Sequence, residues 1–315
     1  MCVGKVVLFF SLKLAQTLKR SAALSMFYIA CCAFCFNESQ QTRKIMKYYI
    51  DTEFLEGTQK ENFPVSLFRK NTPPTIDLIS VGIVAEDGRE YYAISKDFNL
   101  KEAWNRYQIK KDFGKPQGLG DKKVYWIREN VLKPIYEEMF SKAIHDKDYN
   151  RKYFCCLAFN YADLKCLIDW YGKTNKQISE EIKDFVACDC KKGIQQAYDH
   201  YNSEGLCTNN PEFYAYYADY DWVAFCWLFG KMIDLPKGFP MYCIDLKQEF
   251  DEACLRFIKN RRNDKRTYTI HPNETLNTLQ KQLKTKADYP KQENEHNALD
   301  DAKWNKKLHK FLKTL

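Results

Sequence analysis

The order of its apolar runs most constrains the fold of this chain. Residues Lys47 to Phe54 and Thr75 to Ala85 are rich in aromatic and β-branched side chains, and an Asp87-Gly88 turn joins the second run to a third at residues 90–95. Two further strands are predicted at residues 212–218 and 241–244. Helices are predicted at residues 124–140, with an interruption near Pro134, and at residues 175–186, 222–232, 245–259 and 298–315. Hairpin-linked strands followed by strand–helix units predict an α/β fold, a mixed five-stranded sheet with helices on both faces.

The first 45 residues differ in character from the rest. Ser21 to Phe36 is an apolar run preceded by Lys19 and Arg20, similar to a signal-peptide core or a short anchor. It is short for a membrane span, which needs about 20 residues. A targeting segment, a membrane anchor and translated sequence upstream of the true start are the open alternatives. We expect the native start at Met46 and a cytoplasmic protein, or an anchored or exported one if residues 1–45 are genuine.

Charge does not by itself indicate a nucleic-acid partner. The net charge is +8, but residues 1–45 hold six basic residues against Glu38, so the rest carries +3. The thirteen cysteines are an odd number and include adjacent pairs, which favours a reducing compartment. One cluster has ligand types suited to zinc without a recognised spacing, and unpaired thiols are the alternative; it comprises Cys188, Cys190, His200 and Cys207.

Three separated segments carry acidic residues of interest. Asp51 and Glu53 lie two apart on a predicted strand, so their side chains share a face, and in a buried strand they need a compensating cation. Asp219 and Asp221 precede the helix predicted from Trp222, and we expect at least one of them to be its N-cap.

The third acidic segment is "EHNALDDA". Five residues of helix turn through about 140°, so His296 and Asp301 cannot share a ligand inside one regular helix. They can do so if His296 lies in the preceding loop, with Asn297 as the helix cap and Asp301 in the first turn.

"DTEF", "YDWVA" and "HNALDDA", in this order, resemble the three motifs of the DEDDh exonucleases, which have the ribonuclease H-like fold. "YYIDTEFLEG", "IDLISVGIVAEDGREYYAIS", "WIRENVLKPI" and "YYADYDWVAFCWLFG" are similar to the mycobacterial exoribonuclease AS group. The resemblance covers most of a single domain from residue 46 to 315. It leaves out residues 1–45 and predicts insertions near residues 59–72, 141–170 and 187–211.

The resemblance implies a metal-dependent 3′-5′ exoribonuclease that releases 5′-mononucleotides from single-stranded RNA 3′ ends and prefers adenylate. It selects Asp221 over Asp219 and Asp301 over Asp300. Two Mg²⁺ or Mn²⁺ ions would then be held by four carboxylates, with His296 as general base; the ligands are Asp51, Glu53, Asp221 and Asp301.

The substrate contacts, the function and the oligomeric state each have open alternatives. Phe54 and Leu55 follow the acidic pair and are candidates for contact with the terminal nucleotide, and core packing is the alternative for Phe54. The competing functions are a DNA 3′-5′ exonuclease of the same fold, a nucleic-acid-binding protein on an inactive nuclease scaffold, and a membrane-tethered nuclease. A homodimer is also open, and no stable protein partner can be inferred.

Overall fold

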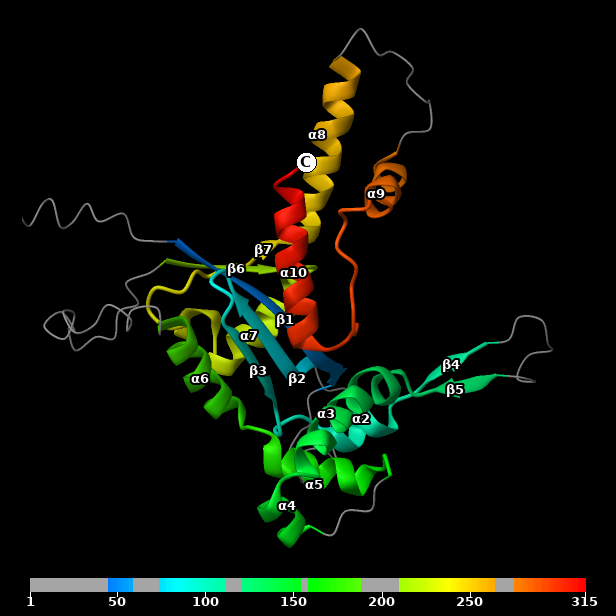
Figure 1. Cartoon of the computed structure of the whole chain (residues 1–315), viewed down its shortest axis with the longest axis vertical. Helices are drawn as coiled ribbons and strands as arrows, with labels where there is room; N and C mark the ends of the chain where they lie inside the picture. Colours follow the sequence, from blue (N-terminus) through cyan, green and yellow to red (C-terminus); the bar gives the residue numbers. More distant parts are fainter. Residues whose placement is uncertain (1–44, 59–73, 112–120, 154–157, 188–209, 264–274) are drawn as a thin grey trace, which may run out of the picture. The chain divides into compact units, whose positions relative to one another are not determined.

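Five strands form one mixed sheet in the computed structural model, in the order β3-β2-β1-β6-β7 (Figure 1). The central strand β1 (Ile45–Thr58) pairs antiparallel with β2 (Pro74–Ala85) and parallel with β6 (Asn210–Ala215). Antiparallel β3 (Glu90–Ile94) and parallel β7 (Ile244–Asp245) complete the edges. The structure describes residues 45–58, 74–111, 121–153, 158–187, 210–263 and 275–315.

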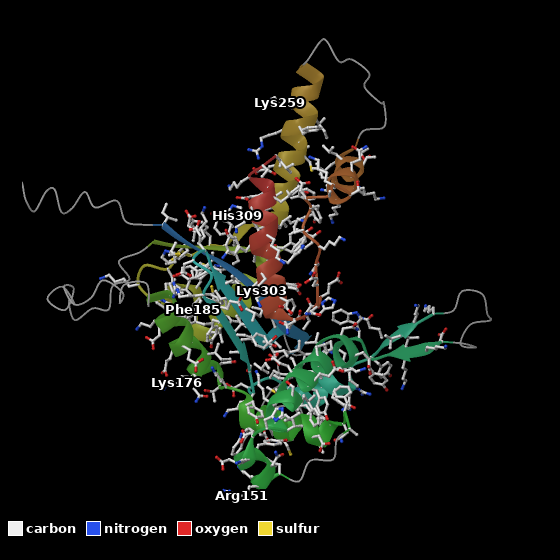
Figure 2. The ribbon with its side chains drawn as sticks, viewed as in Figure 1. Arg151, Lys176, Phe185, Lys259, Lys303 and His309 are labelled. Atoms are coloured by element: carbon white, nitrogen blue, oxygen red, sulfur yellow. The ribbon has the colours of Figure 1, made fainter. Side chains whose placement is uncertain are left out.

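Helices cover both faces of this sheet, because β1 alternates buried aromatic and aliphatic side chains between them. Tyr48 and Ile50 pack in one core with α6 (Asn175–Ala187) and α7 (Ala218–Phe229). Tyr49 packs in a second core, on α8 (Leu246–Asn263), α9 (Leu276–Lys284) and α10 (Ala298–Leu312). Figure 2 labels Lys303 and His309 along α10. The predicted five-stranded α/β fold with helices on both faces is confirmed and is consistent with a ribonuclease H-like fold.

A third core joins the far end of β1 to a group of helices between β3 and α6. Leu55 and Ile79 pack there against α2 (Leu100–Asn105), α3 (Lys133–Ala143) and α5 (Tyr161–Tyr171), and α4 (Lys147–Lys152) follows α3. The interruption predicted near Pro134 is confirmed: a π-helical turn at Arg128–Leu132 leads into α3. Residues 141–170, predicted as an insertion, contain α4 and α5, which were not foreseen as helices.

A separate two-stranded sheet was also not predicted. It consists of β4 (Gln108–Lys110) and β5 (Lys122–Val124), and it explains why the helix predicted from Val124 begins later. A short 3-10 helix (Met232–Asp234) follows α7. The strand predicted at residues 241–244 is instead the short strand β7, which begins at Ile244.

Residues 45–315 make one compact unit. Some predictions fall on residues that the structure does not describe. These are the predictions for residues 1–44, for the insertion near residues 59–72 and for the zinc ligands Cys188, Cys190, His200 and Cys207. The insertion near residues 187–211 lies almost wholly outside the described residues as well. Of the helices that the structure describes, none is both long enough and apolar enough to cross a membrane.

Candidate active site

The central strand carries the first two acidic residues of the site. Asp51 pairs with Gly82 and Glu53 with Ser80 of β2, and the register shifts between Glu53 and Phe54, which marks a β-bulge. The Glu53 side chain is only 12% exposed. Both carboxylates lie in the interior of the central strand rather than at an exposed strand end, the alternative that the two-residue spacing left open.

The first turn of α7 supplies a third carboxylate. Asp221 is buried, and its Oδ1 accepts hydrogen bonds from the Thr52 backbone N–H at 2.8 Å and from the Thr52 hydroxyl at 2.6 Å. Asp219 is exposed. The prediction that one of these two is an N-cap is wrong: α7 begins at Ala218, four residues before the predicted start, so both lie within its first turn.

The loop before α10 has the arrangement predicted for it. Asn297 is the N-cap, and its side chain accepts from the N–H groups of Leu299 and Asp300 at 3.0 and 3.2 Å. The His296 N–H donates to Asp301 Oδ2 at 2.9 Å, with His296 at a φ of 70°. Asp301 is buried, whereas Asp300 lies near Lys303 at 3.5 Å.

A glycine allows α10 to approach the sheet closely at this point. A Cβ on Gly82 would overlap the carbonyl oxygen of Ala298 and the N–H nitrogen of Leu299, so no larger residue fits without movement. Since Gly82 pairs directly with Asp51, this contact sets the first turn of α10 over the acidic strand.

The acidic residues from the three segments interact electrostatically. Burial raises the pKa of Asp51 well above its ordinary value, and the charges of Asp221, Glu53 and Asp301 raise it further. Burial, followed by the charges of Asp301 and Asp221, raises the pKa of Glu53 to about 8. Burial also raises the pKa of Asp221 to about 7, against the lowering effect of the Thr52 hydrogen bonds. All four carboxylates therefore lie within electrostatic range of one another.

These residues fit a divalent cation. One ligand atom each from Glu53, His296 and Asp301 lie within 4.8 Å of one another, and His296 Nδ1 is 3.8 Å from Glu53 Oε1. Mutually repelling, partly buried carboxylates need either protons or a cation, and oxygen donors of this kind are the ligands that Mg²⁺ and Mn²⁺ prefer.

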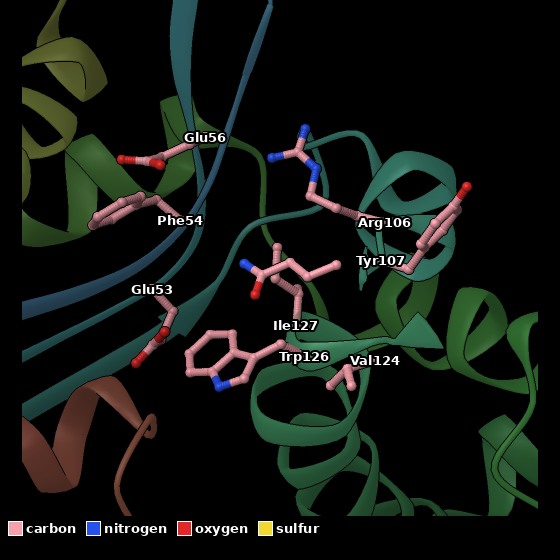
Figure 3. A pocket seen from close by; sticks show the side chains of 9 residues that line it. Glu53, Phe54, Glu56, Arg106, Tyr107, Val124, Trp126 and Ile127 are labelled. Atoms are coloured by element: carbon pink, nitrogen blue, oxygen red, sulfur yellow. The ribbon is translucent and has the colours of Figure 1, made fainter. Parts of the chain in front are cut away.

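A pocket adjoins Glu53 on the side away from α10. Its volume is about 310 Å³, and it lies between β1 and the base of the β4–β5 hairpin (Figure 3). Phe54 also lines it, but its ring points away from the hairpin and packs edge-on against Tyr220 of α7, with centroids 5.6 Å apart (Figure 3). Leu55, in contrast, is 1% exposed and packs in the core with α3 and α5, so it does not line the pocket.

Three residues near the site were missed from sequence. Trp126 lines the pocket, and its ring centroid is 4.7 Å from that of His296. Gln292 Nε2 donates to Asp301 Oδ1 at 2.6 Å, and the charge of Asp245 raises the pKa of Asp221. Trp126 could have been identified from its position at the start of "WIRENVLKPI", a segment similar to the exoribonuclease AS group. No sequence pattern identifies Gln292 or Asp245.

Comparison with known proteins gives a consistent assignment. The 3′-5′ exoribonuclease Rv2179c-like domain model matches residues 68–312. Two Mycobacterium tuberculosis proteins are similar: 3′-5′ exoribonuclease MT2234.1 of strain CDC 1551 / Oshkosh and 3′-5′ exoribonuclease Rv2179c of strain ATCC 25618 / H37Rv. Each is 27% identical over 212 residues, which are 67% of this chain and 78% of the relative. Because the domain model matches well over half of its residues, the chain belongs to the 3′-5′ exoribonuclease Rv2179c-like family.

Proposed function

We propose that this chain is a metal-dependent 3′-5′ exoribonuclease that releases 5′-mononucleotides from the 3′ ends of single-stranded RNA. The observation that carries the proposal is the meeting of four carboxylates and one histidine from three distant segments beside the central strand. Membership of an exoribonuclease family supports the same reaction class.

In this proposal the metal ligands are Asp51, Glu53, Asp221 and Asp301. Four carboxylates balance the charge of two divalent ions, which explains why the site has so many. When bound, two Mg²⁺ or Mn²⁺ ions would lower the pKa of the attacking water and stabilise charge on the scissile phosphate and the leaving 3′-oxygen. Thr52 fixes the orientation of Asp221 through two hydrogen bonds to one carboxylate oxygen and leaves Oδ2 without a contact from Thr52.

His296 is the proposed general base. Its backbone is held by Asp301, its ring lies against Trp126, and its side chain is 36% exposed at the edge of the acidic cluster. A water between this imidazole and the scissile phosphate can pass its proton to the ring as the new P–O bond forms and the bond to the 3′-oxygen breaks.

The pocket beside Glu53 is the proposed site of the terminal nucleotide. Its volume is at the lower end of the range for small-ligand sites, about 300–1,000 Å³. Trp126 offers an aromatic surface on which a base can stack, and Phe54 lines the pocket with its ring against Tyr220. The proposed enzyme prefers adenylate at the 3′ end, and the resemblance to the exoribonuclease AS group is the one support for this preference.

Hydrolysis of end-labelled RNA tests the proposed function. The substrates are 5′-labelled and 3′-labelled RNAs with different 3′ ends and the matched DNAs, with Mg²⁺ or Mn²⁺ and with EDTA. We expect labelled mononucleotide from the 3′ label at once, a descending ladder from the 5′ label, and no product in EDTA. Faster hydrolysis of DNA would instead support a DNA exonuclease, and binding without hydrolysis would support a nucleic-acid-binding protein.

A further inference from the structure

The β4–β5 hairpin extends the proposed nucleotide pocket in one direction. Gln108 of β4 and Val124 of β5 line the pocket and pair with each other at the base of the hairpin. The next residues on the same face, two positions along each strand, are Lys110 and Lys122. Both lysines are exposed, and they are about 7 Å beyond the pocket along the strands.

These two lysines face each other directly. Lys110 pairs with Lys122 in the antiparallel ladder, which brings their Cβ atoms to about 5 Å. Like charges in such a pair destabilise a hairpin. Among the ion pairs of the described residues, none includes either lysine. The pair is therefore an uncompensated positive charge, next to a pocket, on a small exposed sheet.

The charges around the pocket favour one path for a bound polyanion as it leaves the pocket. Its β1 wall carries Glu53 and Glu56, whereas the hairpin wall carries Arg106 and no acidic residue (Figure 3). Arg106 is already paired with Glu102 of α2. Repulsion from Glu56 and attraction to the lysine pair both favour a phosphate backbone that leaves the pocket along the hairpin.

We propose that Lys110 and Lys122 bind the phosphates of single-stranded RNA upstream of the terminal nucleotide, so that the hairpin guides the 3′ end into the pocket. This inference rests on the proposed function, in that the pocket holds the 3′-terminal nucleotide. The partner is recognised by its charge: phosphate oxygens between the two ammonium groups remove the repulsion that the cross-strand pair otherwise causes.

The test compares two variants with equal loss of charge. Lys110→Gln/Lys122→Gln removes the pair, and Lys176→Gln/Lys183→Gln removes two exposed lysines of α6 that take part in no ion pair of the described residues. Binding of a 5′-fluorescein RNA of about 12 nucleotides is followed by anisotropy in EDTA, which prevents hydrolysis, over a series of salt concentrations.

We expect the hairpin variant to bind the RNA about tenfold more weakly than the wild-type protein. The slope of log K against log salt should become shallower by about 1.4, from two single-strand phosphate contacts at about 0.7 each. The α6 variant should bind within twofold of the wild type. Equal binding by the two variants, or a loss of affinity with an unchanged salt slope, would overturn the inference.

Hydrolysis by the wild-type protein separates this inference from the proposed function. With Mn²⁺, cleavage of the same RNA together with equal binding by the two variants would leave the exonuclease standing and remove the hairpin's role. No cleavage together with the expected loss of binding would leave the hairpin's role standing and remove the exonuclease. If both hold, the hairpin variant should raise KM for the long RNA more than KM for a dinucleotide, whose single phosphate is the scissile one and which has no upstream phosphate for the lysine pair.

Discussion

At the residue scale, burial distinguishes the acids that can act together from those beside them. Asp221 and Asp301 are each 6% exposed and point into the cluster, whereas Asp219 faces solvent and Asp300 is partly exposed near Lys303. The free energy that burial costs a carboxylate is recovered only if a proton or a cation neutralises it. Each doublet therefore contains one buried carboxylate and one that is exposed or partly exposed.

Replacing Asp51 by Asn should reduce kcat on RNA by at least about 100-fold, because even residues that only support metal ligands contribute 10–100-fold. The same change removes a repelling charge, so the melting temperature in EDTA should be equal to or higher than that of the wild type. Activity assays with Mn²⁺ and thermal unfolding measure the two effects. Asp219→Asn is the matched control and should retain near-wild-type kcat; undiminished activity of Asp51→Asn would refute the site assignment.

Replacing His296 by Ala should lower kcat by about 10²–10⁴, the usual contribution of a general base, and should leave metal binding intact. Metal binding is measured by titration calorimetry with Mn²⁺, and the pH dependence of kcat is compared with that of the wild type. His145→Ala changes an exposed histidine away from the site and should alter neither quantity. A pH–rate profile that is the same in the His296 variant would remove its role as base.

At the element scale, α10 connects the site to the sheet at two points. Its first turn contacts the backbone of β2 at Gly82, and further along, His309 packs against the stacked rings of Tyr49 and Tyr214, with centroids 5.6 and 4.4 Å away. His309 Nδ1 is hydrogen-bonded to the Tyr49 hydroxyl at 2.8 Å. Displacement of α10 should therefore affect stability and the position of Asp301 together.

Replacing Gly82 by Ala should lower the free energy of unfolding by about 1–3 kcal/mol, as overpacking does, and should also reduce activity. The added methyl group meets backbone atoms of Ala298 and Leu299, which cannot turn away as a side chain can. Urea unfolding and RNA hydrolysis measure the two losses. In the control Gly57→Ala the new Cβ meets mainly the end of the Arg106 side chain, so stability should change less; equal losses in the two variants would contradict the argument.

His309 should make stability depend on pH. Burial, with smaller effects from Lys313 and Lys47, lowers its pKa from 6.5 to about 4. Below pH 6.5 the unfolded chain therefore binds a proton that the folded protein does not, and stability falls as the pH falls from 6.5 to 4, by up to about 3 kcal/mol.

The measurement is urea unfolding of the wild type and of His309→Gln across this pH range. Other groups titrate in both proteins, so the difference between the two curves isolates His309. Parallel curves would show that the imidazole does not titrate between the two states as proposed.

At the scale of the whole molecule, the acidic cluster should make stability depend on pH and, in the proposed function, on the metal. With folded-state pKa values of about 8 for Glu53 and about 7 for Asp221, both raised, the protonated cluster contributes stability at low pH that is lost as pH rises through 7 and 8 in the absence of metal. A cation that binds only the folded protein reverses this loss.

Mg²⁺ or Mn²⁺ should therefore raise the melting temperature, and more at about pH 8.5 than at about pH 6, where protons compete for the carboxylates. At 100 times the dissociation constant the gain is about 2.7 kcal/mol. Thermal unfolding with the metal is compared with KCl of equal ionic strength, and Asp51→Asn/Asp221→Asn should lose the effect. A gain as large in that double variant would place the metal elsewhere.

Much of this molecule could be predicted from local patterns. The alternation in Lys47 to Phe54, the Asp87-Gly88 turn and the Asn297 cap depend on interactions within a few residues, and each lies where the sequence predicts it. The same local reasoning failed for the start of α7, whose first turn is bonded to Thr52 of the distant strand β1. It also missed α4 and α5, although the local N-caps Asp146 and Asn160 begin them.

The sequence by itself determined the candidate residues for the chemistry and placed Asp51 and Glu53 on a strand and Asp301 in the first turn of a helix, because capping, turns and alternation are local energies. Only the tertiary structure decided how they meet. The Phe54 ring packs against Tyr220 of α7, the bare backbone of Gly82 admits α10, and the β4–β5 hairpin pairs Lys110 with Lys122 beside the pocket. Each of these depends on contacts between residues far apart in the chain, whose free energy no local pattern records.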